Sequence, residues 1–297
     1  MYYNHFGLRE LPFSLTPDTS FFFACSSYQE ALNTLLVAAQ TGEGFIKITG
    51  EVGSGKTMLC RKFMASLGER FVCAYIPNPY LEPRALLLAL AEELRVPLER
   101  DADQHRVLKG LTLALLDIAR HGRRALVCLD EAQAMPLQTL EVLRLLTNLE
   151  TQKRKLLQVV LFGQPELDRH LAQESVRQLR QRITFQYRLE GLRGSELDAY
   201  LAHRLAVAGY KGERLFAERA VAVMRRYSGG VPRLANILAH KSMLLAYGEG
   251  TARVEARHVR AAAGDTPAAR RWSRPWEWLS LAATFAAVAV SAWTLLP

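Results

Sequence analysis

The segment Gly50-Glu-Val-Gly-Ser-Gly-Lys-Thr57 constrains the fold of this chain more than any other feature of its sequence. It fits the pattern GxxxxGK followed by Ser or Thr, and it joins an apolar run at 45–49 to an amphipathic run at 55–67. Glycines at these spacings let backbone N–H groups turn inward around a phosphate, and the first turn of a helix adds the positive end of its dipole. The segment therefore predicts a buried strand, a phosphate-binding loop and a helix, in that order.

Six residues of this loop are candidates to bind a nucleotide: Gly50, Gly53, Ser54, Gly55, Lys56 and Thr57. We expect Lys56 to reach the β- and γ-phosphates, and the hydroxyl of Thr57 to bind Mg²⁺. The alternative is a tight glycine-rich turn without a ligand. The full pattern, placed between a predicted strand and a predicted helix, disfavours that alternative.

A second motif lies at 125–131, where a buried apolar run ends in the acidic pair Asp130-Glu131. Ligands of open α/β sheets bind at the carboxyl ends of the strands, so we expect this pair beside the phosphates. Asp130 is predicted to bind Mg²⁺, directly or through water, and Glu131 to polarise the attacking water. The alternative is an exposed acidic loop after a strand.

Three further positions suit a site that hydrolyses phosphate anhydrides. Gln164 comes just after the apolar run at 156–162 and offers an amide that could hold the same water. Arg182, with Arg180 as a second choice, precedes a short strand and is predicted to reach the nucleotide of a neighbouring subunit, where a guanidinium suits developing phosphoryl charge. Arg233 is predicted to begin a helix and to bridge it to the phosphates. The alternatives are a turn residue before proline for Gln164 and solvated surface arginines for the others.

Strand and helix patterns alternate over the first two thirds of the chain. Short apolar runs predict strands at 45–49, 71–76, 125–129, 156–162 and 184–189. Such alternation predicts an α/β fold with a parallel sheet covered on both faces. Beyond Gly191 only helices are predicted, at 195–208, 215–227, 232–247 and 254–263. The predicted organisation is an α/β nucleotide-binding domain at 1–190, a helical lid subdomain at 191–264 and a basic linker at 265–275.

The C-terminal segment differs in composition from the rest of the chain. No charged residue occurs from Trp278 to Pro297, all four tryptophans lie at the edges of this segment, and three arginines precede it at 270–274. Its length as a helix matches the hydrocarbon core of a bilayer, which is about 30 Å thick. We therefore expect a transmembrane helix at 276–297, with residues 1–275 on the cytoplasmic side. A buried or partner-binding helix is the alternative.

Composition excludes several classes of protein. A length of 297 residues is ample for a hydrophobic core, and 49% apolar with 23% charged residues excludes a disordered or collagen-like chain. The net charge of +9 permits nucleotides, nucleic acid or an anionic membrane surface as partners without choosing among them. The four cysteines share no CxxC or zinc-finger spacing, which predicts reduced thiols in a cytosolic compartment.

In their order along the chain, the motifs resemble those of an AAA+ ATPase over about residues 1–264. The matching elements are the loop at 50–57, Asp130-Glu131, Gln164, Arg182 and Gly230-Val-Pro-Arg233, which resemble Walker A, Walker B, sensor 1, an arginine finger and sensor 2. The resemblance implies a P-loop core with a five-stranded parallel sheet and a helical lid. It also implies bound ATP with Mg²⁺ and a ring-shaped homo-oligomer, such as a hexamer, whose active sites are shared between subunits.

A closer resemblance, to the ExeA/GspA group of secretion ATPases and most of all to its members that serve the mannose-sensitive haemagglutinin (MSHA) pilus, rests on shorter segments. These are His5-Phe-Gly7, Leu11-Pro-Phe-Ser14, Thr16-Pro-Asp18, Gly42-Glu-Gly44-Phe and Asp130-Glu-Ala-Gln133. The resemblance implies a single-pass inner-membrane protein with a cytoplasmic ATPase domain. Its implied partners are membrane proteins that assemble a type IV pilus or a type II secretion system. Longer members of the group continue into a peptidoglycan-binding domain, so a cell-wall-binding role is not expected for this chain.

Two other functions remain open from the sequence. A DNA-acting AAA+ ATPase, of the transposition-helper or origin-recognition type, would share the Asp-Glu and Gly-x-Pro-Arg features and the basic charge. The predicted membrane segment, and the little room after the lid for a winged-helix domain, make DNA an unexpected partner. A scaffold that binds ATP with little turnover is the other possibility, and the predicted catalytic role of Glu131 argues against it.

Overall fold

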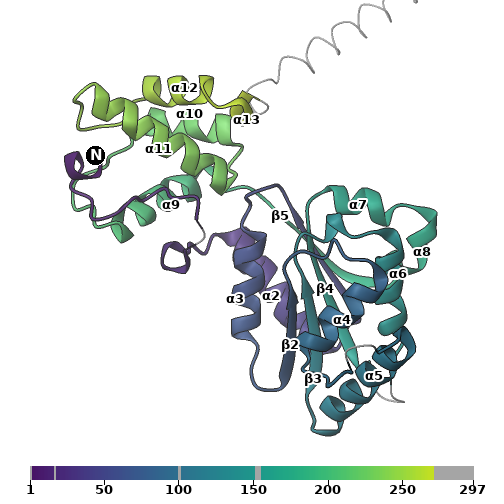
Figure 1. The fold of residues 1–297 in the computed structure, drawn as a ribbon. Coiled ribbons are helices and arrows are strands. Elements are labelled where there is room, and N and C mark those ends of the chain that lie inside the picture. The colour runs from purple at the N-terminus through teal and green to yellow at the C-terminus, as the bar shows by residue number, and fades with distance from the viewer. Residues whose placement is uncertain (1, 17, 100–101, 151–154, 271–297) are drawn as a thin grey trace, which may run out of the picture. The chain divides into compact units, whose positions relative to one another are not determined.

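The computed structural model describes residues 2–16, 18–99, 102–150 and 155–270. The chain divides into two compact units (Figure 1). One unit is Ala24–Glu190, and it contains the whole sheet. The other unit joins Met1–Phe23 to the chain from Gly191 onward, and it is helical where it is described.

Five parallel strands form the sheet of the α/β unit, in the order β2-β3-β4-β1-β5. Their bounds are β1 Phe45–Gly50, β2 Phe71–Ile76, β3 Arg124–Leu129, β4 Leu157–Gly163 and β5 Ile183–Leu189. Every strand begins and ends within one residue of its predicted bounds. The predicted α/β architecture with a parallel sheet is therefore confirmed.

Parallel strands place their carboxyl ends at one edge of the sheet. At this edge Gly50 of β1 pairs with Leu189 of β5, and Leu129 of β3 pairs with Leu161 of β4. The loop after β1, the acidic pair after β3 and the amide after β4 consequently leave the sheet at the same edge. Strand topology alone thus gathers segments that are more than a hundred residues apart in sequence.

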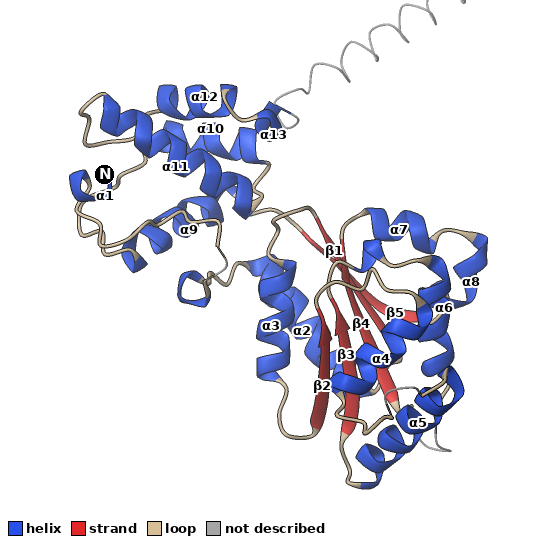
Figure 2. Ribbon diagram, in the orientation of Figure 1, coloured by secondary structure: helices blue, strands red, loops and turns tan. Residues whose placement is uncertain are grey.

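Helices cover both faces of the sheet (Figure 2). They are α2 Ser26–Thr41, α3 Lys56–Ser66, α4 Pro83–Glu93, α5 Gln104–Arg120, α6 Leu137–Leu146, α7 Glu166–Leu171 and α8 Arg177–Arg180. Short 3₁₀ turns occur at Ala132–Ala134 (η2) and Glu174–Val176 (η3).

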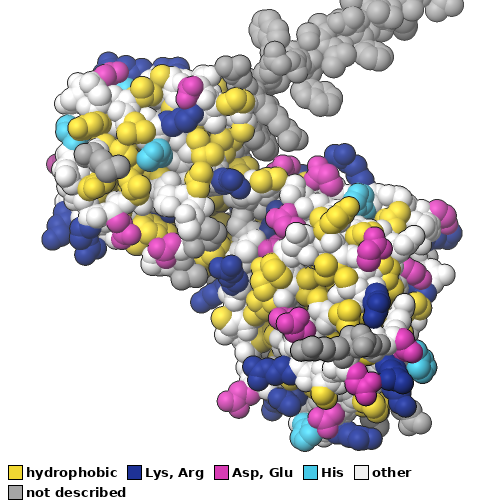
Figure 3. Space-filling view, viewed as in Figure 1, with side chains coloured by type: hydrophobic (Ala, Val, Ile, Leu, Met, Phe, Trp, Pro, Cys, Tyr) yellow, Lys and Arg dark blue, Asp and Glu magenta, His cyan; other side chains and the backbone are white. Residues whose placement is uncertain are grey.

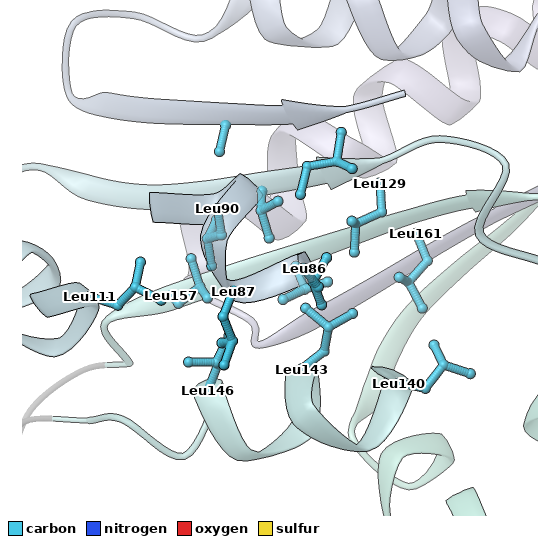
Figure 4. Close-up of a cluster of buried hydrophobic side chains, with 14 of the residues drawn as sticks. Leu86, Leu87, Leu90, Leu111, Leu129, Leu140, Leu143, Leu146, Leu157 and Leu161 are labelled. Atoms are coloured by element: carbon cyan, nitrogen blue, oxygen red, sulfur yellow. The ribbon is translucent and has the colours of Figure 1, made fainter. Parts of the chain in front are cut away.

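A cluster of buried leucines packs between the sheet and helices α4 and α6 (Figure 4). Spacings of one, three and four residues place the apolar side chains of each helix on one face, as an amphipathic helix requires. Each fully buried leucine contributes about 1.5–3 kcal/mol relative to an exposed one. The leucines are Leu86, Leu87 and Leu90 of α4, Leu140, Leu143 and Leu146 of α6, and Leu129, Leu157 and Leu161 of the strands.

The helical unit contains α9 Gly194–Val207, α10 Glu218–Ser228, α11 Pro232–Gly248, α12 Ala256–Gly264 and the short α13 Pro267–Arg270. Helices α9 to α12 confirm the four helices predicted after Gly191 to within two residues at each end, except at the start of α10. Helix α10 begins at Glu218 and not at 215, because Phe216 pairs with Val254 and the N–H of Ala217 donates to the carbonyl of Val254 at 3.0 Å. The backbone groups just before α10 are therefore used outside the helix.

The N-terminal 23 residues belong to the helical unit, which corrects the predicted domain boundary at 1–190. Helix α1 (Tyr2–His5) contacts α11, where the hydroxyl of Tyr2 lies 2.8 Å from Nδ1 of His240. Phe13 is buried against Phe216, with ring centroids 5.8 Å apart. The aromatic residues of the arm thus fill the core of the helical unit, a choice of partner that local sequence patterns do not encode.

The predicted transmembrane helix at 276–297 lies outside the described residues, and so does the predicted linker beyond residue 270. Within the described part of that linker, Pro267–Arg270 form the short helix α13. Within the described part of the chain, no helix combines the length and the apolar character needed to cross a membrane. The four cysteines all lie in the described part, and none forms a disulfide.

Candidate active site

The loop between β1 and α3 has a backbone that requires glycine. Gly53 and Gly55 adopt φ angles of +79° and +97°, in the left-handed region that other L-residues rarely enter. A Cβ on Gly50 would lie 2.7 Å from Oγ of Ser54 and 3.0 Å from Cβ of Leu189. The loop therefore folds tightly at the carboxyl edge of the sheet and ends at the first turn of α3.

Lys56 is buried at the start of α3, with 5% of its surface exposed. Its Nζ donates to the carbonyl oxygens of Gly50 at 2.9 Å and of Glu51 at 3.1 Å. Burial lowers the pKa of Lys56 below its usual range, and the nearby carboxylates of Glu131 and Asp130 oppose that shift. The cation is thus held over the loop, at the side where phosphate would bind.

The donors of this loop fit a phosphate group. The hydroxyl of Ser54 is buried and makes no hydrogen bond with any described residue. A buried polar group without a partner is costly, and an anion oxygen would accept its hydrogen bond. The first N–H groups of α3, the ammonium of Lys56 and the hydroxyls of Ser54 and Thr57 form the donor set typical of a nucleotide phosphate site.

Two oxygen donors suited to Mg²⁺ meet beside the loop. The hydroxyl of Thr57 donates to Oδ2 of Asp130 at 2.6 Å, and the N–H of Glu131 donates to Oδ1 of Asp130 at 3.0 Å. Burial raises the pKa of Asp130 above its usual range, although these hydrogen bonds favour the ionised form. A buried carboxylate of this kind is stabilised by a cation, and carboxylate and hydroxyl oxygens are ligands that Mg²⁺ accepts. The structure therefore brings Thr57 and Asp130 together, and their binding of Mg²⁺ stays a prediction.

Glu131 follows Asp130 and has a left-handed backbone, with φ +55° and ψ +37°. Its Oε2 accepts hydrogen bonds from Nε2 of Gln133 at 2.6 Å and from Nε2 of Gln164 at 3.0 Å. Burial by itself would raise the pKa of Glu131, but the two amide hydrogen bonds and the charge of Lys56 outweigh it, so the pKa lies below its usual range. The carboxylate is consequently ionised and held in one orientation.

The structure brings Gln164 to Glu131, as the sequence predicted, and adds a residue to which the sequence gave no role. Gln133 lies in the turn η2, where its Oε1 accepts the backbone N–H of Gln164 at 2.9 Å. Its position two residues after Glu131 was the available signal. That signal is weak in a sequence, because the turn that directs the side chain back toward Glu131 is a property of the fold.

Arg182 does not lie with this group. It precedes β5 at the amino end of the strand, whereas Leu189 at the other end pairs with Gly50. Its guanidinium contacts the side chain of Asn148 and lies 3.5 Å from Oγ1 of Thr147. Arg180 is exposed at the end of α8. Neither arginine belongs to the site of its own chain, and action in a neighbouring subunit stays a prediction.

Arg233 lies in the helical unit as the second residue of α11, and it is exposed. The turn before it contains Gly229 and Gly230, with φ angles of +59° and +76°. Proline at the first position and two glycines before it explain why a helix begins here. An interaction of Arg233 with the phosphates stays a prediction.

Comparisons with known proteins agree with this geometry. A family model described as "AAA domain" matches residues 39–171, which include the phosphate loop, Asp130, Glu131 and Gln164. The chain is 42% identical over 254 residues to General secretion pathway protein A of Aeromonas hydrophila, a match that covers 86% of this chain and 46% of that protein. The chain therefore spans less than half the length of this relative.

Solved structures share the fold at low sequence identity. The ORC2 protein of Aeropyrum pernix superposes with a TM-score of 0.61 at 19% identity, covering 86% of this chain and 71% of that one. Cdc6p of Pyrobaculum aerophilum gives 0.61 at 18% identity, covering 86% and 70%. The RuvB branch migration motor of Thermotoga maritima gives 0.53 at 17% identity, covering 81% and 69%. The α/β unit is thus a P-loop AAA core, and the chain is related to general secretion pathway protein A.

Proposed function

We propose that this chain is an AAA+ ATPase that binds ATP with Mg²⁺ and hydrolyses it. The observation that carries the proposal is the arrangement around Glu131: an ionised carboxylate, fixed by two amides, lies at the sheet edge next to a phosphate loop and a Thr57–Asp130 pair. A scaffold that only binds nucleotide would not need a carboxylate held in this way.

Each residue has a defined task in the proposed reaction. Lys56 and the first turn of α3 bind the phosphate oxygens, and Thr57 with Asp130 holds Mg²⁺, which neutralises charge on the phosphates when bound. Glu131 accepts a hydrogen bond from the attacking water and orients it toward the γ-phosphate. The amide of Gln164, 3.0 Å from Glu131, contacts the same water.

The charge that develops in the transition state needs a further cation. We propose that Arg182 supplies it to the site of a neighbouring subunit in a ring-shaped homo-oligomer, such as a hexamer. Its position at the opposite edge of the sheet from Gly50 supports action between subunits and not within one. Arg233 is proposed to contact the phosphates from the helical unit.

We propose further that the ATPase supports assembly of a type IV pilus of the MSHA kind, or of a type II secretion system, at the inner membrane. The relationship to general secretion pathway protein A supports a secretion machine. Residues 278–297, which carry no charge, and the tryptophans at the edges of this segment support a single-pass membrane protein with its ATPase domain in the cytoplasm.

The test uses the full chain with Glu131→Gln, and Glu174→Gln, an exposed position, as the matched control. The Glu131 variant is expected to bind ATP like the wild type and to hydrolyse it about 10²–10⁴-fold more slowly. If the wild type hydrolyses ATP no faster than the Glu131 variant, the result would support a scaffold that binds nucleotide and would contradict the proposed ATPase.

The same variant then identifies the machine. After extraction from membranes with nuclease present, pilus or secretion proteins are expected to co-purify in an ATP-dependent manner. Retention of DNA alone, when nuclease is omitted, would favour a DNA-acting ATPase, since one neighbour of the same fold is the Drosophila ORC bound to DNA. On the face shown in Figure 3, basic and acidic side chains are interspersed.

A further inference from the structure

We infer that Gln133 is a positioning residue for hydrolysis: it holds one oxygen of Glu131 so that the other is the only one left to accept the water's hydrogen bond. The inference rests on the proposed function, because it assigns a task to a residue next to the proposed catalytic carboxylate. Its structural basis is the triangle of hydrogen bonds among Gln133, Glu131 and Gln164.

The orientation of the Gln133 amide follows from its partners. A backbone N–H can only donate, so the atom of Gln133 that faces the N–H of Gln164 must be the carbonyl oxygen Oε1. The NH₂ group of Gln133 must then face Glu131, at 2.6 Å from Oε2. Because the acceptor side is anchored to backbone, the amide cannot rotate without losing both hydrogen bonds.

The two oxygens of Glu131 are consequently not equivalent. Gln133 and Gln164 both donate to Oε2, and no described residue donates to Oε1. A carboxylate has lone pairs on both oxygens, so Oε1 keeps its full capacity to accept a hydrogen bond from water.

The backbone N–H that Gln133 accepts lies directly after a strand of the sheet. Gln164 is the first residue after β4, and Gly163 is the last residue of that strand. A Cβ on Gly163 would lie 3.3 Å from Oε1 of Gln133 and 2.7 Å from Cδ2 of Leu167. Because residue 163 is a glycine, there is room for the Gln133 amide beside the end of β4. Gln133 therefore connects Glu131 to the backbone directly after this strand.

The experiment compares Gln133→Met, Gln133→Glu and the control Gln138→Met in the full chain. Methionine is similar in length to glutamine but removes both hydrogen bonds. Glutamate keeps an acceptor for the N–H of Gln164 but places a second negative charge beside Glu131. Gln138 is exposed at the start of α6, so its substitution matches the chemistry at a position outside the triangle.

For Gln133→Met we expect kcat to fall about 10–100-fold, the loss typical of a misplaced catalytic group, with the KM for ATP within about twofold. Gln133→Glu should lower kcat further, because a second negative charge repels the carboxylate of Glu131 from the position in which Gln133 holds it. Gln138→Met should match the wild type.

The inference is overturned if Gln133→Met keeps the wild-type kcat. It is also overturned if kcat, ATP affinity and melting temperature all fall together, since that pattern describes a purely structural residue.

A second measurement does not depend on hydrolysis. The side-chain amide protons of Gln133 are observed by NMR at fixed pH, with Gln133→Met identifying their signals. A clear change of these signals in Glu131→Ala supports the hydrogen bond from Gln133 to Glu131, and unchanged signals overturn it. If the wild-type chain hydrolyses no ATP, the proposed function fails, and the NMR signals still decide whether Gln133 is hydrogen-bonded to Glu131.

Discussion

The hydroxyl of Thr57 donates to Oδ2 of Asp130 across 2.6 Å, which connects the first turn of α3 to the residue that follows β3. The two side chains converge because β1 and β3 both end at the same edge of a parallel sheet. Lys56, one residue before Thr57, points back over the loop to the carbonyl of Gly50. The groups proposed to bind phosphate and those proposed to bind Mg²⁺ are thus adjacent in the fold.

Lys56→Met should weaken ATP binding. The variant removes a buried ammonium and its charge-assisted hydrogen bonds, which are worth about 1.5–3 kcal/mol, so the Kd for ATP should rise about 10–100-fold. Binding of a fluorescent ATP analogue measures the change. Lys62→Met, at an exposed position on the same helix, is the matched control and should bind like the wild type. Equal affinity in both variants would contradict the assignment of Lys56.

Asp130→Asn should stabilise the chain at neutral pH when neither nucleotide nor Mg²⁺ is supplied. Because burial raises the folded-state pKa of Asp130 above its unfolded value of 3.8, the ionised form is penalised in the folded state. The penalty is absent below the unfolded pKa, appears as the pH rises through the folded pKa, and is complete above it.

The melting temperature of Asp130→Asn should therefore exceed that of the wild type by roughly 2–4 °C at neutral pH, with the gap closing in acid. Thermal unfolding in EDTA across pH measures this. Asp117→Asn, an exposed position on α5, controls for the change of a surface charge. A melting temperature for Asp130→Asn below that of the wild type at neutral pH would show that the carboxylate stabilises the fold.

Arg182→Ala should abolish most ATP hydrolysis. Mixing it with a second inactive variant should restore part of the activity. An arginine supplied to a neighbouring site contributes about 10³–10⁵-fold to kcat in comparable phosphoryl transfers. Mixed assemblies of Arg182→Ala and Glu131→Gln should regain activity, since a site with intact Glu131 then borrows Arg182 from its neighbour. Arg177→Ala, at an exposed position in α8, is the control. If the mixed assembly is no more active than either variant alone, the result would argue against action of Arg182 between subunits.

Gly230→Ala should destabilise the helical unit. Gly230 has φ +76°, and a Cβ there would lie 2.4 Å from the carbonyl oxygen of Leu192. The same two residues are joined by a hydrogen bond, in which the N–H of Leu192 donates to the carbonyl of Gly230 at 2.8 Å. We expect a loss of about 2–4 kcal/mol, the range for a forced backbone shift.

Limited proteolysis and thermal unfolding measure the loss in the full chain. Gly248→Ala is the matched control, because a Cβ at that helical position meets nothing within 4 Å. It should be neutral or stabilising by about 0.5–1 kcal/mol. Similar behaviour of the two alanine variants would disprove the role of the Gly230 contact.

Sequence patterns predicted the features of this protein that depend on residues close together in the chain. The apolar run of each strand, the glycines that allow the left-handed angles at Gly53 and Gly55, and the acidic pair after β3 are all consecutive in sequence. Gln164 was found in the same way, as a polar residue after an apolar run. The N-terminal arm was misplaced, because an aromatic residue such as Phe13 can fill the core of either unit.

The sequence by itself determined the α/β alternation, the phosphate loop and the carboxylates, because backbone conformation and hydrophobic periodicity act over a few residues. Only the tertiary structure decided that Phe13 packs on Phe216, and that Arg182 lies at the opposite edge of the sheet from Gly50. It also decided that Gln133 turns back to Glu131. These outcomes depend on strand order and on which buried surfaces meet, and such long-range contacts are set by the free energy of the whole fold and not by any local segment.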